Sequence, residues 1–236
     1  VPQTGFAAFN GATGAHDPTV AGTRLSASVA ALVQVSGGKV VVGGAFSHLN
    51  GAAVSTLIRL NAGGSLDNTF NSGGSGPTGG IASVAVQGDG KLLIAGSFTS
   101  YNGTARMGLA RLAPDGALDP GFDLGSTASP QIGSVQALAG GRALISGSFS
   151  SINGTPRRRV ARVHVDGTLD PSFVPFVGAA VPSFSIPVVR AQPDERVLFG
   201  TDGTISSGGQ TLPTLLRLNR DGSVDSTYSP GFDTRG

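Results

Sequence analysis

The chain has 236 residues, of which 38 are Gly and 14 are Pro, while 13% are charged and 39% are apolar. So many helix breakers and so few charges exclude a helical bundle, and a formal net charge of +2 gives no reason to expect a nucleic-acid partner. No apolar stretch approaches the roughly 18 residues of a membrane-spanning helix, so we expect no membrane insertion, and the absence of cysteine excludes disulfides.

The first 20 residues are predicted to be a partial copy of a unit that recurs later in the chain. Residues 13–18 (TGAHDP) resemble residues 115–120 (DGALDP). We therefore expect residues 1–20 to form one hairpin, the second half of a repeat. Such a hairpin would pair with the last repeat, or lie beside it, and cover the strand edges that an open ring exposes.

Three segments of the chain align without gaps. They begin at Lys39, Lys91 and Arg142, so the spacings are 52 and 51 residues, and each segment ends in Asn-Gly. A fourth, diverged copy covers residues 196–225 and has Gly203 where the other copies have Phe. A period near 51 residues indicates a repeat architecture.

Each repeat is predicted to contain four strands, a to d. In the second copy they span residues 81–87, 91–98, 109–112 and 117–122. The Asp-Gly and Asn-Gly dipeptides between them are typical of hairpin turns, because Gly adopts positive φ without a Cβ clash. Strand b is almost wholly apolar, so we expect it to be buried on both faces and its terminal Phe to pack between neighbouring units. The three copies of this residue are Phe46, Phe98 and Phe149.

An arginine in strand c recurs with an aspartate eight positions later. A hairpin turn centred between the two residues places them directly opposite each other, where opposite charges stabilise a strand pair by roughly 0.2–1 kcal/mol. We interpret the pairs as structural, and the alternative is a ring of anion-binding arginines around a central channel. The pairs are Arg59 with Asp67, Arg111 with Asp119, Arg162 with Asp170 and Arg217 with Asp225.

These features predict an all-β single domain over residues 1–236, a β-propeller of about 51-residue, four-stranded blades. Its parts are a partial repeat at residues 1–20 and repeats at residues 28–72, 81–123, 132–173 and 186–228, the last of them degenerate. Four full repeats and a half repeat predict a four-bladed ring or a reduced five-bladed ring. The alternative is an open β-solenoid-like array, although solenoid coils are usually shorter.

One motif runs through the second copy. It consists of Asp89-Gly-Lys91 to Phe98, Asn102-Gly103, Ala110-Arg-Leu112, Asp115-Gly116, Leu118-Asp119 and Phe122. This motif resembles the bacterial delta-60 repeat, also known as the domain-of-unknown-function β-propeller repeat, and the resemblance covers roughly residues 28–228. It implies a propeller-like fold and an occurrence in large secreted or cell-surface bacterial proteins. It implies no activity.

No residue pattern points to a catalytic or metal centre. The histidines His16, His48 and His164 occupy different repeat positions and lack the spacing of zinc ligands. Residues 73–80 (GGSGPTGG) open no helix, so we interpret them as a connector between blades rather than a phosphate-binding loop. Apart from one Asp-Glu pair, the turn aspartates come one per turn, which suits turn chemistry better than a calcium site. We expect no cofactor, no metal and no catalytic residue.

The loops between strands b and c are the candidate ligand-binding region, because radially arranged blades would bring these loops to one face. The second loop holds a Tyr with Asn and Arg neighbours, which can stack on a sugar and hydrogen-bond it, or bind an anion. The alternative is that Asn-Gly is only a turn and the arginines form a solvated edge. The candidate residues are His48, Asn50, Tyr101, Asn102, Arg106, Asn153, Arg157, Arg158 and Arg159.

The sequence favours a non-enzymatic extracellular propeller scaffold for adhesion or recognition, as a segment of a larger surface protein. The first alternative is a lectin-like glycan-binding module, and the second is a propeller glycosidase or lyase, which would need two carboxylates at one channel mouth. The resemblance predicts a secreted or cell-surface location. The expected partners are a glycan or a protein at the b–c loops, further copies of the chain, or neighbouring repeats of a longer chain.

Overall fold

The computed structural model describes residues 24–125, 131–175, 188–200 and 215–229, together with six short strand segments. Within these residues, four equivalent antiparallel sheets of three strands follow one another along the chain, here called blades 1 to 4. Blade 1 comprises β5 (Val29–Gln34), β6 (Val40–Gly44) and β9 (Leu57–Leu60); blade 2 comprises β10 (Ile81–Val86), β11 (Leu92–Gly96) and β14 (Leu109–Leu112). Blade 3 comprises β15 (Ile132–Ala137), β16 (Ala143–Gly147) and β19 (Val160–Val163); blade 4 comprises β21 (Val188–Ala191), β22 (Val197–Gly200) and β25 (Leu215–Leu218).

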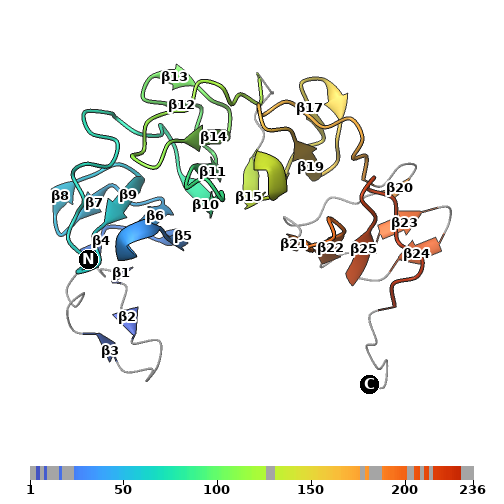
Figure 1. The fold of residues 1–236 in the computed structure, drawn as a ribbon, viewed down its shortest axis with the longest axis horizontal. Coiled ribbons are helices and arrows are strands. Elements are labelled where there is room, and N and C mark those ends of the chain that lie inside the picture. Colours follow the sequence, from blue (N-terminus) through green and yellow to red (C-terminus); the bar gives the residue numbers. More distant parts are fainter. Residues whose placement is uncertain are drawn as a thin grey trace.

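The blades are arranged along an arc, with the first strand of each blade on the concave side (Figure 1). Short 3-10 turns, η2 (Ser36–Gly38) and η3 (Ala139–Gly141), join the first two strands of blades 1 and 3. Hydrogen bonds link the inner strands of neighbouring blades: the Ser83 hydroxyl accepts from the Val135 amide at 3.2 Å, and the Gln136 side chain accepts from the Ala191 amide at 2.8 Å. This radial arrangement is that of a propeller, as the sequence predicts.

A small hairpin stands between the second and third strands of each blade. These hairpins are β7 (His48–Leu49) with β8 (Ala52–Ala53), β12 (Ser100–Tyr101) with β13 (Thr104–Ala105), β17 (Ser151–Ile152) with β18 (Thr155–Pro156), and β23 (Ile205–Ser207) with β24 (Gln210–Leu212). In three blades the segment that leads into the blade pairs with the hairpin: β4 (Arg24–Leu25) with β7, Pro77 with Tyr101, and β20 (Ala179–Ala180) with β23. The hairpins therefore fasten the start of each blade to its outer side.

The fourth strand of each blade is shorter than the sequence predicts. Residues 117–122 contribute one bridge, Leu112 with Leu118, and the other blades show the equivalent single bridge. The reason is the aspartate that follows, because the Asp119 carboxylate accepts a hydrogen bond from the Gly121 amide at 2.9 Å. This Asx turn bends the chain away from the sheet one residue after the bridge. The blades are thus three-stranded sheets with one further bridge.

Glycine at the end of the second strand lets the backbone that enters the same blade pass close by. A Cβ on Gly96 would lie 2.1 Å from the Gly80 carbonyl oxygen, and one on Gly147 would lie 2.0 Å from that of Gln131. Both carbonyls belong to the residue that precedes the first strand of the same blade. A side chain at these positions would therefore clash with the incoming backbone.

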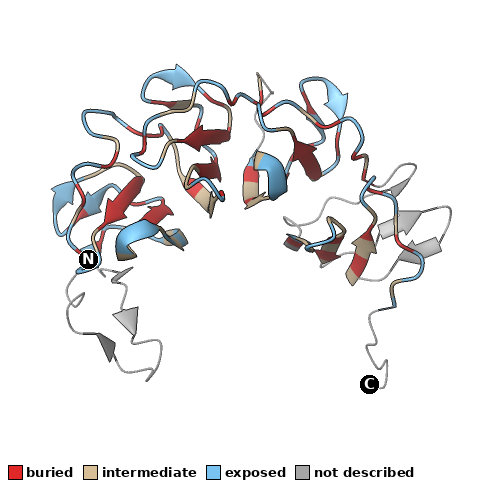
Figure 2. Cartoon of the chain, in the orientation of Figure 1, coloured by how far each residue is buried: buried red, intermediate tan, exposed pale blue. Residues whose placement is uncertain are grey.

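Three of the four hydrophobic clusters among the described residues lie between neighbouring blades, and the fourth, which contains Phe46, belongs to blade 1 and its hairpin. In the core between blades 1 and 2, Val41 and Leu57 of blade 1 pack with Ile94 and Phe98 of blade 2. Equivalent cores join blade 2 to blade 3 and blade 3 to blade 4. Figure 2 shows burial concentrated in the blade strands, whereas the small hairpins are largely exposed. The prediction that strand b is buried on both faces is confirmed, and Phe46, Phe98 and Phe149 are 0%, 1% and 5% exposed.

The N-terminal residues are described only in three two-residue strands. β2 (Ala8–Phe9) pairs antiparallel with β3 (His16–Asp17), in agreement with the predicted hairpin. β1 (Thr4–Gly5) pairs with β4 beside blade 1, whereas the sequence predicts that this segment pairs with or lies beside the last repeat. The rest of that prediction, and Gly203, lie outside the described residues. In the described part of the chain, no helix is long and apolar enough to cross a membrane.

Candidate functional site

The recurring arginine and aspartate form an ion pair in each blade, and both side chains are buried in blades 1 and 3. The register brings them together, because the Asp119 amide donates to the Arg111 carbonyl and the Leu112–Leu118 bridge lies next to them. Each guanidinium also lies over the aromatic ring that follows three residues after the aspartate, 4.8 Å from the ring centre for Arg111 and Phe122. The predicted pairing is confirmed in all four copies, with Nε–Oδ2 distances of 2.7, 2.9, 2.6 and 2.8 Å for Arg59–Asp67, Arg111–Asp119, Arg162–Asp170 and Arg217–Asp225.

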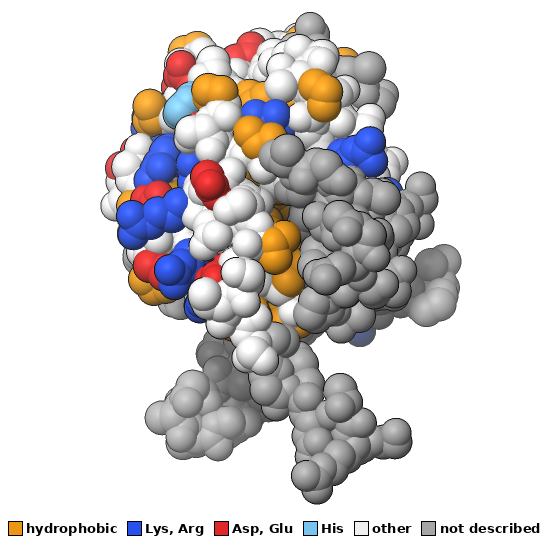
Figure 3. Space-filling view, turned by 90° about the vertical axis from the view of Figure 1, so that its right-hand side faces the viewer, with side chains coloured by type: hydrophobic (Ala, Val, Ile, Leu, Met, Phe, Trp, Pro, Cys, Tyr) orange, Lys and Arg blue, Asp and Glu red, His pale blue; other side chains and the backbone are white. Residues whose placement is uncertain are grey.

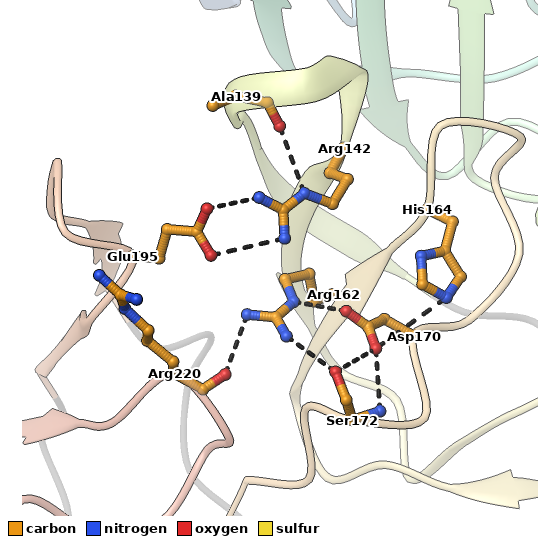
Figure 4. A network of polar contacts seen from close by, with 8 residues as sticks. All are labelled: Ala139, Arg142, Arg162, His164, Asp170, Ser172, Glu195 and Arg220. Atoms are coloured by element: carbon orange, nitrogen blue, oxygen red, sulfur yellow. Dashed lines mark hydrogen bonds and ion pairs between the residues drawn. The ribbon is translucent and has the colours of Figure 1, made fainter.

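The same arginines join one blade to the next, which the sequence analysis missed. Arg162 Nη1 of blade 3 donates to the Arg220 carbonyl of blade 4 at 2.9 Å, and its Nη2 donates to the Ser172 hydroxyl (Figure 4). The equivalent acceptors are the Pro114 carbonyl for Arg59 and the Val165 carbonyl for Arg111. The guanidinium groups of these arginines are thus used in ion pairs within a blade and in hydrogen bonds to the next blade. The alternative of an anion-binding ring is not supported. A signal was present in the sequence, because each acceptor lies in the next copy's c–d turn, 54–58 residues later.

The Asn-Gly dipeptides form the hairpin turns that the sequence predicts. Asn102 and Gly103 have φ of 48° and 78°, so both central residues are left-handed, as a type I′ turn requires. The asparagine side chain also holds the incoming connector: Asn102 Oδ1 accepts from the Gly76 amide at 2.7 Å. In the other blades Asn50 Oδ1 accepts from the Arg24 amide, and Asn153 Nδ2 donates to the Leu124 carbonyl. These three candidate residues therefore have a structural role, and residues 73–80 are a connector between blades, as predicted.

Three of the candidate ligand-binding residues are buried, which corrects the prediction for them. Tyr101 is 0% exposed because Pro77 covers its strand and the ring packs in the core between blades 1 and 2. Its hydroxyl donates to the Gly116 carbonyl at 2.7 Å, and burial raises its pKa. Arg106 and Arg157 are each 7% exposed. Tyr101 therefore offers no ring for a sugar to stack on, which removes the observation behind the lectin-like alternative.

The remaining candidates do not gather into one pocket. His48 and Arg158 are exposed and Arg159 is half-buried; His48 lies on the hairpin of blade 1, and the two arginines lie in the segment that follows the hairpin of blade 3. Figure 1 places the hairpins β7–β8, β12–β13 and β17–β18 one after another along the outer side of the arc. The candidate residues are thus spread over successive blades, as positions on a long surface rather than the lining of one cavity.

The sequence comparison identifies the repeat. The family described as "Domain of unknown function (DUF5122) beta-propeller" matches residues 38–70, 87–122, 141–173 and 192–228, which together are more than half of the chain. The chain belongs to the DUF5122 family. The matched segments include the second and third strands of all four blades and the Arg–Asp pairs, so the family pattern coincides with the inter-blade packing described above. No curated protein matches the chain.

Solved structures similar to this DUF5122 chain are propellers and extracellular domains. Two crystal structures of the extracellular domain of BT4673 from B. thetaiotaomicron align with a TM-score of 0.51, at 12% and 13% identity. The alignments cover 85% and 95% of this chain but only 23% and 26% of those chains, so the DUF5122 chain spans about a quarter of their length. A GH74 xyloglucanase from Xanthomonas campestris aligns with a TM-score of 0.45 at 15% identity, over 84% of this chain and 27% of the xyloglucanase. The likeness at a TM-score of 0.51 concerns the fold alone.

The ends of the blades opposite the small hairpins carry mixed charge. In Figure 3, Lys and Arg side chains alternate with Asp and Glu side chains along one margin of the molecule. These groups pair with each other: Arg142 of blade 3 binds Glu195 of blade 4, and Lys91 binds Asp119 at 2.9 Å. The turn aspartates accept from the amide two residues later, as Asp89 does from Lys91. Among the described residues, no three His, Asp or Glu side chains form a group that can hold a metal ion.

The described residues of the DUF5122 chain line pockets that include two which the sequence analysis did not single out. One, of about 390 Å³, lies between the turns of blade 4 and is lined by Asp194, Arg196, Asn219, Arg220 and Asp221. The other, of about 210 Å³, lies beside Val54 in blade 1. A signal for the second was present in the sequence, since Val54 stands where the next two copies have Arg106 and Arg157.

We expect acid to weaken the DUF5122 blades between about pH 4 and pH 2. Desolvation raises the pKa of Asp119 and of Asp170, but hydrogen bonds, from Lys91 and Arg111 to Asp119 and from Ser172 and Arg162 to Asp170, outweigh it and leave both near 2. An unfolded Asp titrates near 3.9, so these carboxylates stabilise the fold above that pH and lose their contribution as the pH falls through the folded pKa. Urea unfolding at pH 7, 4, 3 and 2 measures this loss. The Asp119→Asn variant should lose less stability across that pH range, and an equal loss would contradict the assignment.

Proposed function

We propose that this DUF5122 domain is a non-enzymatic, extracellular recognition module, in which the blades form a rigid scaffold and the small hairpins carry the binding surface. One observation carries the proposal. In the described blades, the recurring arginines and aspartates of strands c and d are used in packing and the recurring Asn-Gly dipeptides form turns, whereas exposed side chains such as His48 and Arg158 have different counterparts in the other copies. Two of the recurring arginines, Arg111 and Arg162, are each 6% exposed. Variable side chains on a rigid frame are typical of recognition surfaces.

The extracellular part of the proposal has separate support. The two similar crystal structures at a TM-score of 0.51 are both of an extracellular domain. The chain has no cysteine that an oxidising compartment would alter. Fastening by inter-blade hydrogen bonds and ion pairs provides the rigidity that an uncrosslinked domain needs outside the cell.

The binding surface is tested with matched variants at the two ends of the blades. The domain is immobilised and screened against panels of glycans and of extracellular proteins. We expect the His48→Ser, Arg158→Ser double variant to bind its ligand at least tenfold more weakly, because both side chains are exposed, His48 on the hairpin of blade 1 and Arg158 in the segment that follows the hairpin of blade 3. Val165→Ser serves as the control, since Val165 is 53% exposed but lies in the turn at the other end of blade 3.

The outcome also separates recognition from catalysis. The bound ligand is recovered and analysed by mass spectrometry, and we expect it to be unchanged. Conversion of the ligand by the domain would overturn the proposal of a non-enzymatic module. An affinity that falls equally in the Val165→Ser control would place the binding surface away from the hairpins.

A further inference from the structure

The backbone shows that Val54 occupies the position in blade 1 that Arg106 occupies in blade 2 and Arg157 occupies in blade 3. Each of the three residues directly follows the second strand of its small hairpin, β8, β13 or β18. Each donates its amide hydrogen to a carbonyl seven residues earlier: Val54 to Ser47 at 2.8 Å, Arg106 to Thr99 at 3.0 Å and Arg157 to Ser150 at 3.0 Å. The three blades therefore differ here by side chain and not by chain path.

In blades 2 and 3 this position places a guanidinium group in the interior. Arg106 and Arg157 are each 7% exposed. Arg106 Nη1 donates to the Ala105 carbonyl at 2.8 Å and to Asp123 Oδ2 at 3.3 Å. Arg157 Nη1 donates to the Pro156 carbonyl at 2.8 Å. The carbonyl of the preceding residue is thus the acceptor that both blades share.

In blade 1 the shorter Val54 leaves this space open as a pocket of about 210 Å³. Its lining includes Ala53 and Asn71, which are the counterparts of Ala105 and Asp123 and so of both partners of Arg106. A volume of about 210 Å³ is several times the roughly 30 Å³ that one water molecule occupies in the liquid, so the pocket can hold a group of several heavy atoms. The rim, Ala53 and residues 72–74, is exposed, which leaves the pocket open to a partner.

The charged groups around the pocket are paired with each other, since Asp67 binds both Arg59 and Lys39, each at 2.7 Å. Asp67 and Phe70 line the pocket together with Arg59. Arg59 does not exclude a second guanidinium group from the pocket, because the Arg59 guanidinium already donates hydrogen bonds to Asp67 and to the Pro114 carbonyl of blade 2. The equivalent arginines of blades 2 and 3 likewise coexist with Arg106 and Arg157. We propose that the pocket beside Val54 binds the guanidinium group of an arginine side chain from a partner protein.

The proposed interaction is defined by the sister blades. The incoming guanidinium would donate to the Ala53 carbonyl, as Arg106 donates to that of Ala105. The Asn71 side-chain oxygen, the counterpart of the Asp123 carboxylate, already accepts from Asn102 Nδ2 at 2.6 Å and would accept the guanidinium as a second donor. Planar guanidinium groups with several donors fill such a site better than a lysine ammonium, which is a compact, strongly hydrated point charge. The origin of the ligand rests on the proposed recognition function, whereas the pocket itself is tested by a small probe.

The probe is methylguanidinium, titrated into the ¹⁵N-labelled domain below the concentration at which circular dichroism detects unfolding. We expect saturable shifts of the Ala53, Val54 and Asn71 amide resonances. Val54→Arg fills the pocket with the chain's own guanidinium and should abolish these shifts. Arg106→Val opens the equivalent pocket in blade 2 and should add a second set of shifts at Ala105 and Asp123. Arg157→Val gives the same test in blade 3 if the Arg106→Val chain does not fold.

Each outcome has one meaning. Shifts that do not saturate, or that persist in the Val54→Arg variant, would overturn the proposal. Equal shifts with methylammonium would show a general cation site and would also overturn it. The peptides Gly-Arg-Gly and Gly-Lys-Gly then test the partner chemistry, with at least tenfold tighter binding expected for the arginine peptide. A negative result here leaves the hairpin experiment with His48 and Arg158 untouched, so the two proposals fail separately.

Discussion

Replacement of Arg111 by methionine should lower the free energy of unfolding by about 3–5 kcal/mol, the range for breaking a buried ion pair. The Arg111 side chain is 7% exposed and Asp119 is 15% exposed, so little water reaches the site, and Asp119 keeps only its ion pair with the more exposed Lys91 at 2.9 Å. The substitution also leaves the Val165 carbonyl of blade 3 without its donor and removes the cation from the Phe122 ring. Urea unfolding followed by circular dichroism measures the change.

A double-mutant cycle separates the ion pair from the other contacts of Arg111. Asp119→Asn keeps an oxygen that can accept from the Gly121 amide, so the cycle with Arg111→Met reports mainly the charge interaction. We expect a coupling of about 0.5–3 kcal/mol. Arg158→Met is the control, because this exposed arginine of blade 3 should change stability by less than about 0.5 kcal/mol. Additive single effects in the cycle would contradict direct pairing.

The features that the sequence predicts correctly are local ones. The Arg111–Asp119 pair follows from a spacing of eight residues around one turn, and the Asn102–Gly103 turn follows from the dipeptide itself. The burial of Phe98 follows from its place at the end of an apolar run. Each inference needs only residues near each other in the chain. The regular period then extends these local results to every copy.

The features that the sequence analysis misses depend on residues from different repeats or on competing local bonds. Tyr101 lies in a loop by sequence, but the Pro77 connector of the preceding blade covers it. The pocket beside Val54 can be inferred from the alignment of Val54 with Arg106 only once the structure shows that the Arg106 side chain is buried. Strand d is shortened because the Asp119 carboxylate accepts a hydrogen bond from the Gly121 amide. Hydrophobic patterning does not reveal such a hydrogen bond.

Replacement of Phe98 by alanine should cost about 3–5 kcal/mol, the range for large-to-small substitution of a buried aromatic ring. Phe98 is 1% exposed and packs with Val41 and Leu57 of blade 1, so the cavity would open between two blades. Because the blades touch only their neighbours, we expect the loss to appear first as weakened protection of blades 1 and 2. Denaturant unfolding gives the magnitude, and amide hydrogen exchange gives the location.

The matched control for Phe98→Ala is Leu32→Ala, which removes an apolar side chain that is 54% exposed on the first strand of blade 1. This variant should change the free energy of unfolding by less than about 0.5 kcal/mol. A loss below about 1 kcal/mol for Phe98→Ala would mean that the blades do not rely on this ring for their contact. Uniform loss of exchange protection over all four blades would instead show that the array unfolds as one cooperative unit, with the blade 1–blade 2 core stabilising the whole of it.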